Sequence, residues 1–291
     1  MKVAIISDIH GNLPALKTAV SDIDQWQPDH VIVNGDIVNR GPLSADCLTL
    51  LLDRQQKQGW QMVRGNHEDY LLECEAGRMA VDGPEAEINQ FAYFAHAQLN
   101  GRAPILATFP KSVSLFAPDG SELRATHGSM RHNRDGIYLT SADDELRAQI
   151  APPPAIFATS HTHRPLIRHI DQTTVVNIGS VGASFDGDRR LSYGRFTWTP
   201  AAGWQTEIIR LPYDTNQIEK DYVTSGFLEG GGPLAQLMLL ELRRAGGLIY
   251  RWASRYQDAV VNGNISLADS VRELMRDEDL RPFIGPPGWT P

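Results

Sequence analysis

The 291-residue sequence has only two cysteines, no excess of positive charge and no long apolar run. Cys47 and Cys74 each lie in a predicted helix, and we interpret them as packed thiols rather than as a disulfide or a catalytic nucleophile. The formal net charge of −8 argues against a basic face for duplex nucleic acid. No segment approaches the about 20 apolar residues of a membrane span, and the apolar start is too short for a signal peptide. We therefore expect a soluble, cytoplasmic protein that binds neither duplex nucleic acid nor a membrane.

Strand and helix patterns alternate at the start of the chain. Apolar, β-branched runs are each followed by residues at helical spacing, in the order 2–7, 13–26, 31–34, 44–56, 60–64 and 68–79. Such consecutive βα units predict a largely parallel sheet. After a further predicted helix at 85–99 the chain becomes rich in strands, at 112–117, 123–126, 156–159, 173–178, 191–199 and 204–211. We expect these later strands to form a second sheet packed on the first.

From residue 214 onward the spacing of apolar residues is helical. The predicted helices cover residues 215–223, 234–244, 248–261 and 267–276. We therefore expect two parts: residues 1–213 would form the domain that contains the sheets, and residues 214–291 a helical extension packed on or beside it. The role of this extension is open, since it could cover the sheets, shape a pocket or mediate homo-oligomerisation.

Side chains that can bind metal ions follow several predicted strands. Asp8 and His10 come directly after the first strand, Asp36 after the second, and Asn66 with His67 after the third. Later runs end at His127, His161 and His163. Because the carboxyl ends of strands in an open α/β sheet form the crevice where ligands bind, we expect these side chains to converge.

The number of these ligands suits two metal ions better than one. Two ions about 3.5–4 Å apart need a bridging group, and Asp36, on the middle strand, is the natural bridge. The neutral imidazole and amide ligands leave much of the metal charge uncancelled, so such a site should attract a phosphate. A purely structural metal site fits poorly, because structural sites saturate their metal with protein ligands.

Five sequence blocks resemble those of the calcineurin-like metallophosphoesterases. They are Asp8-Ile9-His10, the segment from Gly35 to Gly41, Gly65-Asn66-His67-Glu68, the lone His127, and His161-Thr162-His163. The segments 127–129 and 177–182 are similar to the bacterial phosphodiesterase-type branch, while Arg40 and Arg64 match arginines of the phosphoprotein phosphatase branch. The resemblance implies a four-layer αββα sandwich, an α/β fold of two mixed sheets flanked by helices.

The resemblance also implies a role for each site residue. One metal ion would be held by Asp8, His10, Asp36 and His163. The other would be held by Asp36, Asn66, His127 and His161. A hydroxide on the metal ions would attack phosphorus, with Asp36 and His67 as catalytic residues and His67 as the acid that protonates the leaving oxygen. Arg40 would contact phosphate like the matching arginine of the phosphatase branch, and Arg131 follows the His127 block closely enough to reach the substrate; for both, the alternative is a surface salt bridge.

Two departures from the family pattern concern the surroundings of these residues. Asn39 stands where the phosphoprotein phosphatase branch has an aspartate that holds the catalytic histidine as a cation, so His67 should be a weaker acid catalyst unless Glu68 compensates. Ser160 replaces the glycine that usually opens the last block.

The predicted function is metal-dependent hydrolysis of phosphate esters. A phosphodiesterase with a small, phosphorylated, nucleotide-like substrate is the leading hypothesis. The alternatives are a phosphomonoesterase that acts on phosphoprotein or dinucleoside polyphosphate, and a non-catalytic scaffold with the same fold. The expected cofactors are two divalent metal ions, with Mn as the first candidate, because the mixed His, Asp and Asn ligands suit Mn, Fe or Zn.

Overall fold

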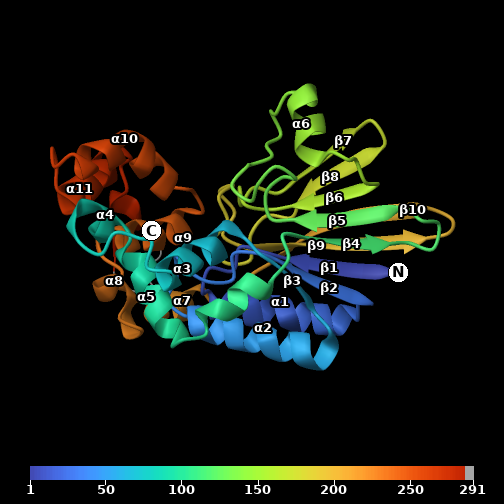
Figure 1. The fold of residues 1–291 in the computed structure, drawn as a ribbon, viewed down its shortest axis with the longest axis horizontal. Helices are drawn as coiled ribbons and strands as arrows, with labels where there is room; N and C mark the ends of the chain where they lie inside the picture. The colour runs from blue at the N-terminus through green and yellow to red at the C-terminus, as the bar shows by residue number, and fades with distance from the viewer. Residues whose placement is uncertain (286–291) are drawn as a thin grey trace.

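The computed structural model describes residues 1–285, which contain two five-stranded sheets packed face to face (Figure 1). The first sheet consists of β1 (Lys2–Ile6), β2 (His30–Asn34), β3 (Gln61–Val63), β9 (Leu191–Thr199) and β10 (Gly203–Leu211), in the order β10-β9-β1-β2-β3. The second consists of β4 (Ser112–Phe116), β5 (Glu122–Thr126), β6 (Ile156–Thr159), β7 (Leu166–Ile170) and β8 (Thr173–Asn177), in the order β4-β5-β6-β8-β7.

Both sheets are mixed. In the first, β1, β2 and β3 run parallel, whereas β9 and β10 are antiparallel to their neighbours. The prediction that residues 191–199 and 204–211 belong to the second sheet was therefore wrong. After the second sheet is complete the chain returns to the first, where β9 pairs with the edge of β1 that β2 leaves open, with Lys2 opposite Thr197.

Helices cover the outer face of each sheet and complete the predicted αββα sandwich. Helices α1 (Leu13–Trp26) and α2 (Ser44–Gln58) lie along the first sheet, and α6 (Asp143–Ile150) lies beyond the second (Figure 1). The start of α1 is as predicted, because the Asn12 side chain accepts a hydrogen bond from the N–H of Ala15. Neither the short α6 nor β7 was predicted from the sequence.

Successive side chains of β1 point to opposite faces of the first sheet, so the strand packs against the second sheet on one face and against helices on the other. Val3 and Ile5 point between the sheets, where they join Val176 and Phe196 in one apolar cluster. The alternate residues of β1, Ala4 among them, pack instead with the residues of α1 and α2. A strand that is buried on both faces in this way fits the central position of β1 in its sheet.

A second group of helices gathers beyond one end of the sheets (Figure 1). Its members are α3 (Asn66–Glu75), α4 (Gly83–Ile88), α5 (Gln90–Leu99), α7 (Thr215–Thr224), α8 (Phe227–Gly230), α9 (Pro233–Arg244), α10 (Ile249–Val261) and α11 (Leu267–Asp277), with the 3₁₀ segments η1 (Ala103–Thr108) and η2 (Arg281–Phe283). The single helix predicted at 85–99 is thus two helices that meet at Asn89. The N-terminus lies at the far end of β1, so β1 runs toward this helical group (Figure 1).

The helices of the C-terminal region share an apolar core with the earlier part of the chain. Leu71 and Phe91 belong to the same buried cluster as Phe227, Leu234 and Trp252. The proposed division between residues 213 and 214 therefore separates two parts that pack against each other through apolar side chains. Residues 286–291 of the proposed extension lie outside the described residues. No helix in the described part of the chain is both long and apolar enough to cross a membrane.

Candidate metal centre

The predicted metal ligands meet at the carboxyl ends of the strands that run toward the helical group. Asp8 and His10 lie in the loop after β1, Asp36 follows β2, and Asn66 with His67 opens α3 directly after β3. From the second sheet, His127 follows β5, while His161 and His163 follow β6. All of these side chains except the half-buried His161 are buried.

The loops that carry the ligands have an unusual backbone. Asp8, His10, Asp36, His161 and His163 all adopt positive φ angles, between 46° and 57°. Such angles are uncommon for residues other than glycine, and they concentrate at functional sites. Backbone hydrogen bonds hold these turns together, because the carbonyl of Asp36 accepts both the N–H of Ile9 at 2.8 Å and that of His10 at 3.0 Å. The first two loops are thereby fixed relative to each other.

Within the site the side chains form two groups, each of which contains three residues of one predicted ligand set. Asp8, His10 and His163 bring their ligand atoms within 4.8 Å of one another, and so do Asp36, His127 and His161. Asn66 joins the second group, because its Oδ1 lies 3.0 Å from His127 Nε2. Asp36 also belongs to a third group, with His10 and His67, and so lies between the two sets.

The donor atoms fit a bound cation. Neither carboxylate oxygen of Asp8 has a hydrogen-bond partner among residues 1–285, although the side chain is fully buried. His10 and His163 direct Nδ1 at the carbonyls of Asn39 and Ala183, which can only accept, so both Nδ1 atoms carry the proton. The two Nε2 atoms then face each other at 3.3 Å, and that of His163 lies 3.0 Å from Asp8 Oδ1. Buried carboxylate oxygens without a hydrogen bond and two converging imidazole nitrogens form a donor set that a bound cation would satisfy.

The electrostatics of the site lead to the same conclusion. Burial lowers the pKa of His10 to about 3 and that of His161 to about 4, so both imidazoles are neutral and able to bind metal near pH 7. Burial also opposes a charge on His127, but the carboxylates of Asp36 and Asp8 outweigh it and raise the pKa of His127 to about 10. The buried carboxylates of Asp8 and Asp36 thus favour positive charge at the centre of the site, and divalent ions would supply it.

Glu68 supports the backbone of the site rather than the catalytic histidine. Its carboxylate accepts hydrogen bonds from the backbone N–H groups of Asp36 at 2.7 Å, Gly65 at 2.8 Å and Ile37 at 2.8 Å. Burial and the nearby Asp36 carboxylate raise the pKa of Glu68 to about 7. The expectation that Glu68 compensates for Asn39 beside His67 was therefore wrong, because this carboxylate binds backbone N–H groups, that of Val38 at 3.5 Å included.

His67 is oriented by Asn39 and by neighbouring rings. The Oδ1 atom of Asn39 accepts the N–H of Arg40 at 2.9 Å, so the amide Nδ2 faces His67 Nδ1 at 3.1 Å. Tyr70 stacks on the His67 ring with centroids 5.4 Å apart, and His10 meets it edge-on at 4.9 Å. Burial lowers the pKa of His67 well below its usual range. The ring is thus held beside the ligands by contacts on several sides.

Comparison with protein families agrees with this site. The model of the calcineurin-like phosphoesterase superfamily domain matches residues 1–199, which include every predicted metal ligand. The chain belongs to the calcineurin-like phosphoesterase superfamily. It is a metallophosphoesterase whose buried histidine and aspartate cluster is consistent with a dinuclear metal centre.

Relatives of this phosphoesterase include proteins of known and unknown activity. An uncharacterized protein of Methanocaldococcus jannaschii is 26% identical over 240 residues, which cover 76% of this chain and 90% of the relative. A symmetrical bis(5'-nucleosyl)-tetraphosphatase of Yersinia enterocolitica is 37% identical over 79 residues, but these cover only 26% of each chain.

Solved structures show the same fold. A metallophosphoesterase from Sphaerobacter thermophilus superposes with a TM-score of 0.64 at 26% identity, covering 84% of this chain and 99% of the other. A hypothetical protein from Pyrococcus horikoshii OT3 superposes with a TM-score of 0.65 at 16% identity, covering 79% and 98% of the two chains. The predictions of family and fold class are therefore confirmed.

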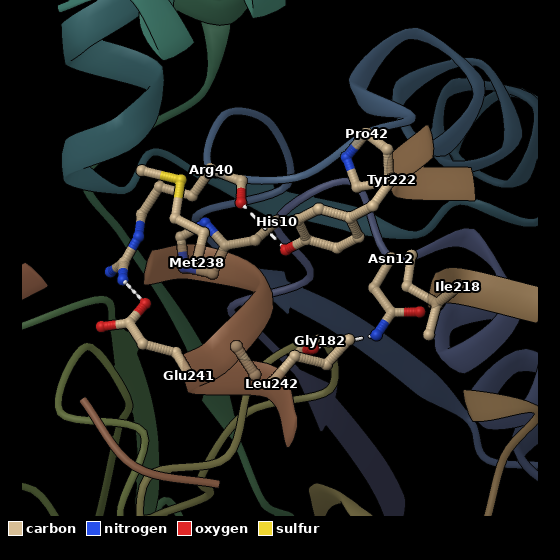
Figure 2. A pocket seen from close by; sticks show the side chains of 11 residues that line it. His10, Asn12, Arg40, Pro42, Gly182, Ile218, Tyr222, Met238, Glu241 and Leu242 are labelled. Carbon is tan, nitrogen blue, oxygen red and sulfur yellow. Dashed lines mark hydrogen bonds and ion pairs between the residues drawn. The ribbon is translucent and has the colours of Figure 1, made fainter. Parts of the chain in front are cut away.

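The arginines predicted near the substrate occupy different surroundings. Arg40 lines a small cavity together with His10 and pairs with Glu241 of α9 (Figure 2). Arg131 is more exposed and pairs with Asp135 and Glu145, on the rim of a cavity of about 100 Å³ that His127 also lines. Of these two arginines, only Arg40 lines a cavity together with a residue of the first ligand group, His10.

A buried polar network behind the ligands was not predicted from the sequence. The hydroxyl of Ser160 accepts a hydrogen bond from Ser7 at 2.8 Å and from the amide of Asn34 at 3.1 Å, and it lies 3.3 Å from His127 Nδ1. The serine that replaces the family glycine thus ties the loops after β1, β2 and β6 together. The only feature of the sequence that pointed to this network was the serine at position 160, where the family motif has glycine.

Proposed function

We propose that this metallophosphoesterase hydrolyses a small, nucleotide-like phosphodiester at two divalent metal ions. The observation that carries the proposal is the fully buried carboxylate of Asp8, whose oxygens make no hydrogen bond among the described residues and whose Oδ1 faces His163 Nε2 at 3.0 Å. A group in this state is stable only beside a cation. Asp36, between the two ligand groups, supports a second ion that shares this residue.

The proposed ligand sets are those expected from the sequence. Asp8, His10, Asp36 and His163 would hold one ion. Asp36, Asn66, His127 and His161 would hold the other. Bound divalent ions would supply a nucleophile from water near neutral pH and would stabilise negative charge on the phosphoryl oxygens. Mn is the first candidate, and Fe and Zn suit the same donors.

Side chains of this protein would protonate the leaving group and bind the phosphoryl group. His67 has its Nδ1 turned to Asn39, so its Nε2 is the atom that gives a proton to the leaving oxygen. Arg40, beside His10, binds a phosphoryl oxygen of the substrate. The segment 177–182 closes one side of the site, because Gly182 N–H and the Ser180 hydroxyl both donate to the carbonyl of Asp8 at 2.8 Å.

Diester specificity rests on the similarity of segments 127–129 and 177–182 to the phosphodiesterase-type branch. A second candidate function is hydrolysis of a dinucleoside polyphosphate. The tetraphosphatase of Yersinia enterocolitica supports this alternative, but the similarity spans 79 residues only. A scaffold without activity is disfavoured, because the structure brings the whole predicted ligand set together.

Hydrolysis of two chromogenic esters tests the proposal. Metal-stripped protein would be reloaded with Mn and assayed on bis(p-nitrophenyl) phosphate and on p-nitrophenyl phosphate. We expect faster cleavage of the diester, no cleavage by the Asp36→Asn variant, and unchanged cleavage by the control variant Asp53→Asn, whose side chain is 50% exposed on α2. Preference for the monoester would contradict the phosphodiesterase assignment. Cleavage that survives in Asp36→Asn would contradict the metal site itself.

A further inference from the structure

The C-terminal helices contribute one wall of the metal site. A small cavity beside the ligands is lined on one side by His10 and Arg40, from the loops after β1 and β2 (Figure 2). Its other side is formed by Tyr222 of α7 and by Met238 and Glu241 of α9. The region whose role the sequence left open therefore reaches the candidate metal centre.

Glu241 is held in one orientation by the helix that follows it. Its side chain is 3% exposed, and its Oε1 accepts the backbone N–H groups of Leu248 at 2.6 Å and Ile249 at 2.8 Å, at the start of α10. The other oxygen, Oε2, accepts a hydrogen bond from Arg40 Nη2 (Figure 2). Because two backbone donors fix the carboxylate, the position of Arg40 Nη2 is fixed as well.

Further contacts keep Arg40 beside the ligand cluster. Its backbone adopts a φ of 64°, and its carbonyl accepts a hydrogen bond from the Tyr222 hydroxyl at 3.4 Å (Figure 2). Its guanidinium carbon lies 5.7 Å from the centre of the Phe185 ring. That ring in turn stacks on His163, with centroids 4.3 Å apart. The guanidinium is thus placed at the edge of the first ligand group.

The guanidinium keeps donors to spare in this arrangement. Only Nη2 of Arg40 has a hydrogen-bond partner within residues 1–285, so Nε and Nη1 are open to a ligand. The side chain is 14% exposed and lines the cavity, so it is not sealed off from a ligand. A planar guanidinium can bind a phosphoryl oxygen with such donors while another nitrogen stays on a carboxylate.

We propose that Glu241 is a positioning residue that holds Arg40 so that one of its remaining N–H groups, on Nε or on Nη1, binds a phosphoryl oxygen of the substrate. The C-terminal helices then contribute to substrate binding, because Glu241 of α9, held by the start of α10, orients the guanidinium of Arg40. This inference rests on the proposed function for the identity of the ligand as a phosphoryl group.

Three variants separate positioning from a general structural role. Glu241→Gln keeps an oxygen for Leu248 and Ile249 N–H but turns an amide N–H₂ toward Arg40, so it breaks this contact alone. Arg40→Ala removes the arginine, and the double variant tests whether Glu241 acts through it. The control is Glu219→Gln on α7, a buried glutamate that pairs with Arg243 at 2.9 Å.

Two measurements are made on the Mn-loaded protein with all 291 residues of the sequence. The first is the Kd of inorganic phosphate by calorimetry, and the second is KM and kcat for bis(p-nitrophenyl) phosphate. We expect Glu241→Gln and Arg40→Ala each to raise Kd and KM by about tenfold, because one charge-assisted contact is lost or misdirected. The kcat of Glu241→Gln should change by about twofold at most, and thermal unfolding should stay close to that of Glu219→Gln.

The double variant decides the proposal. If Glu241 acts through Arg40, Glu241→Gln in the Arg40→Ala background leaves the phosphate Kd unchanged. Additive losses, or an unchanged phosphate Kd in either single variant, would overturn the positioning role. If the wild type cleaves neither ester, the proposed function fails, and the phosphate Kd still decides whether Glu241 positions Arg40 for a phosphoryl group.

Discussion

The carboxylate of Glu68 accepts the backbone N–H of Asp36 at 2.7 Å, so a side chain outside the ligand set holds the residue that lies between the two ligand groups. The same carboxylate binds the N–H groups of Gly65 and Ile37. A side chain larger than hydrogen at Gly65 would also collide with Asp36, since an added Cβ would lie 2.2 Å from Asp36 Oδ1. The turn after β2 is therefore fixed from the side of α3.

Replacing Glu68 by glutamine should weaken metal binding. One acceptor oxygen would become an N–H₂ group that faces backbone N–H donors, so the Asp36 turn would shift. We expect metal affinity to fall by about 10–100-fold, as for other groups that support ligands. A chelator competition titration measures this, with Asp69→Asn on the same helix as control. Equal affinities for Glu68→Gln and wild type would show that the turn does not depend on this carboxylate.

Removing the Ser160 hydroxyl should destabilise the fold. Ser160→Ala would leave one amide N–H of Asn34 without its buried acceptor, whereas the Ser7 hydroxyl would keep the carbonyls of Asn34 and Gly35. We expect a loss of about 1–3 kcal/mol in the free energy of unfolding, the usual cost of unsatisfied buried groups. Urea denaturation measures it, with the exposed Ser254→Ala as control. A loss no larger than that of the control would contradict the role of this network.

His67→Ala should slow hydrolysis in proportion to how poor the leaving group is. An alkoxide leaves as a strong base and needs a proton, whereas p-nitrophenolate does not. We expect kcat to fall by about 100-fold or more for an alkyl ester and by less than about tenfold for the p-nitrophenyl ester. His96→Ala, which removes a histidine that pairs with Glu75 on α3, is the control. Equal effects on both esters would exclude His67 as the proton donor.

Asp8→Asn should lower stability without metal and lower it further with metal. In the metal-free protein burial raises the pKa of Asp8, but His163 at 3.0 Å and His127 outweigh it and lower this pKa, so a neutral amide should lower Tm by on the order of 5 °C. With Mn present the wild type should melt at the higher temperature, because it binds the ion more tightly. Thermal unfolding with a chelator and with Mn shows both effects. An equal rise in Tm on adding Mn to the wild type and to Asp8→Asn would refute this account of the carboxylate.

Local patterns were enough to predict which candidate ligands lie together. Each ligand follows directly after an apolar strand, and parallel strands bring such positions to one edge, so Asp8, Asp36 and Asn66 could be placed together without coordinates. The same reasoning predicted the helices that cover the first sheet. Periodicity and strand ends are local properties of the chain, which explains why they could be read from it.

Contacts between distant parts of the chain could not be predicted in this way. The strand pattern of β9 says nothing of its partner, and it pairs with β1 rather than with the second sheet. Glu241 meets Arg40 across 201 residues, and no motif surrounds it. Glu68 looked like a partner of the neighbouring His67, but in the fold backbone N–H groups are closer to its carboxylate.

The number of metal ions bound per chain tests the central claim most directly. Elemental analysis after equilibration with Mn should find two ions in the wild type, one in Asn66→Ala, and weakened binding of both in Asp36→Asn, because only Asp36 is proposed to hold both ions. One ion in the wild type, or two ions of unchanged affinity in Asp36→Asn, would contradict a dinuclear centre bridged by this residue.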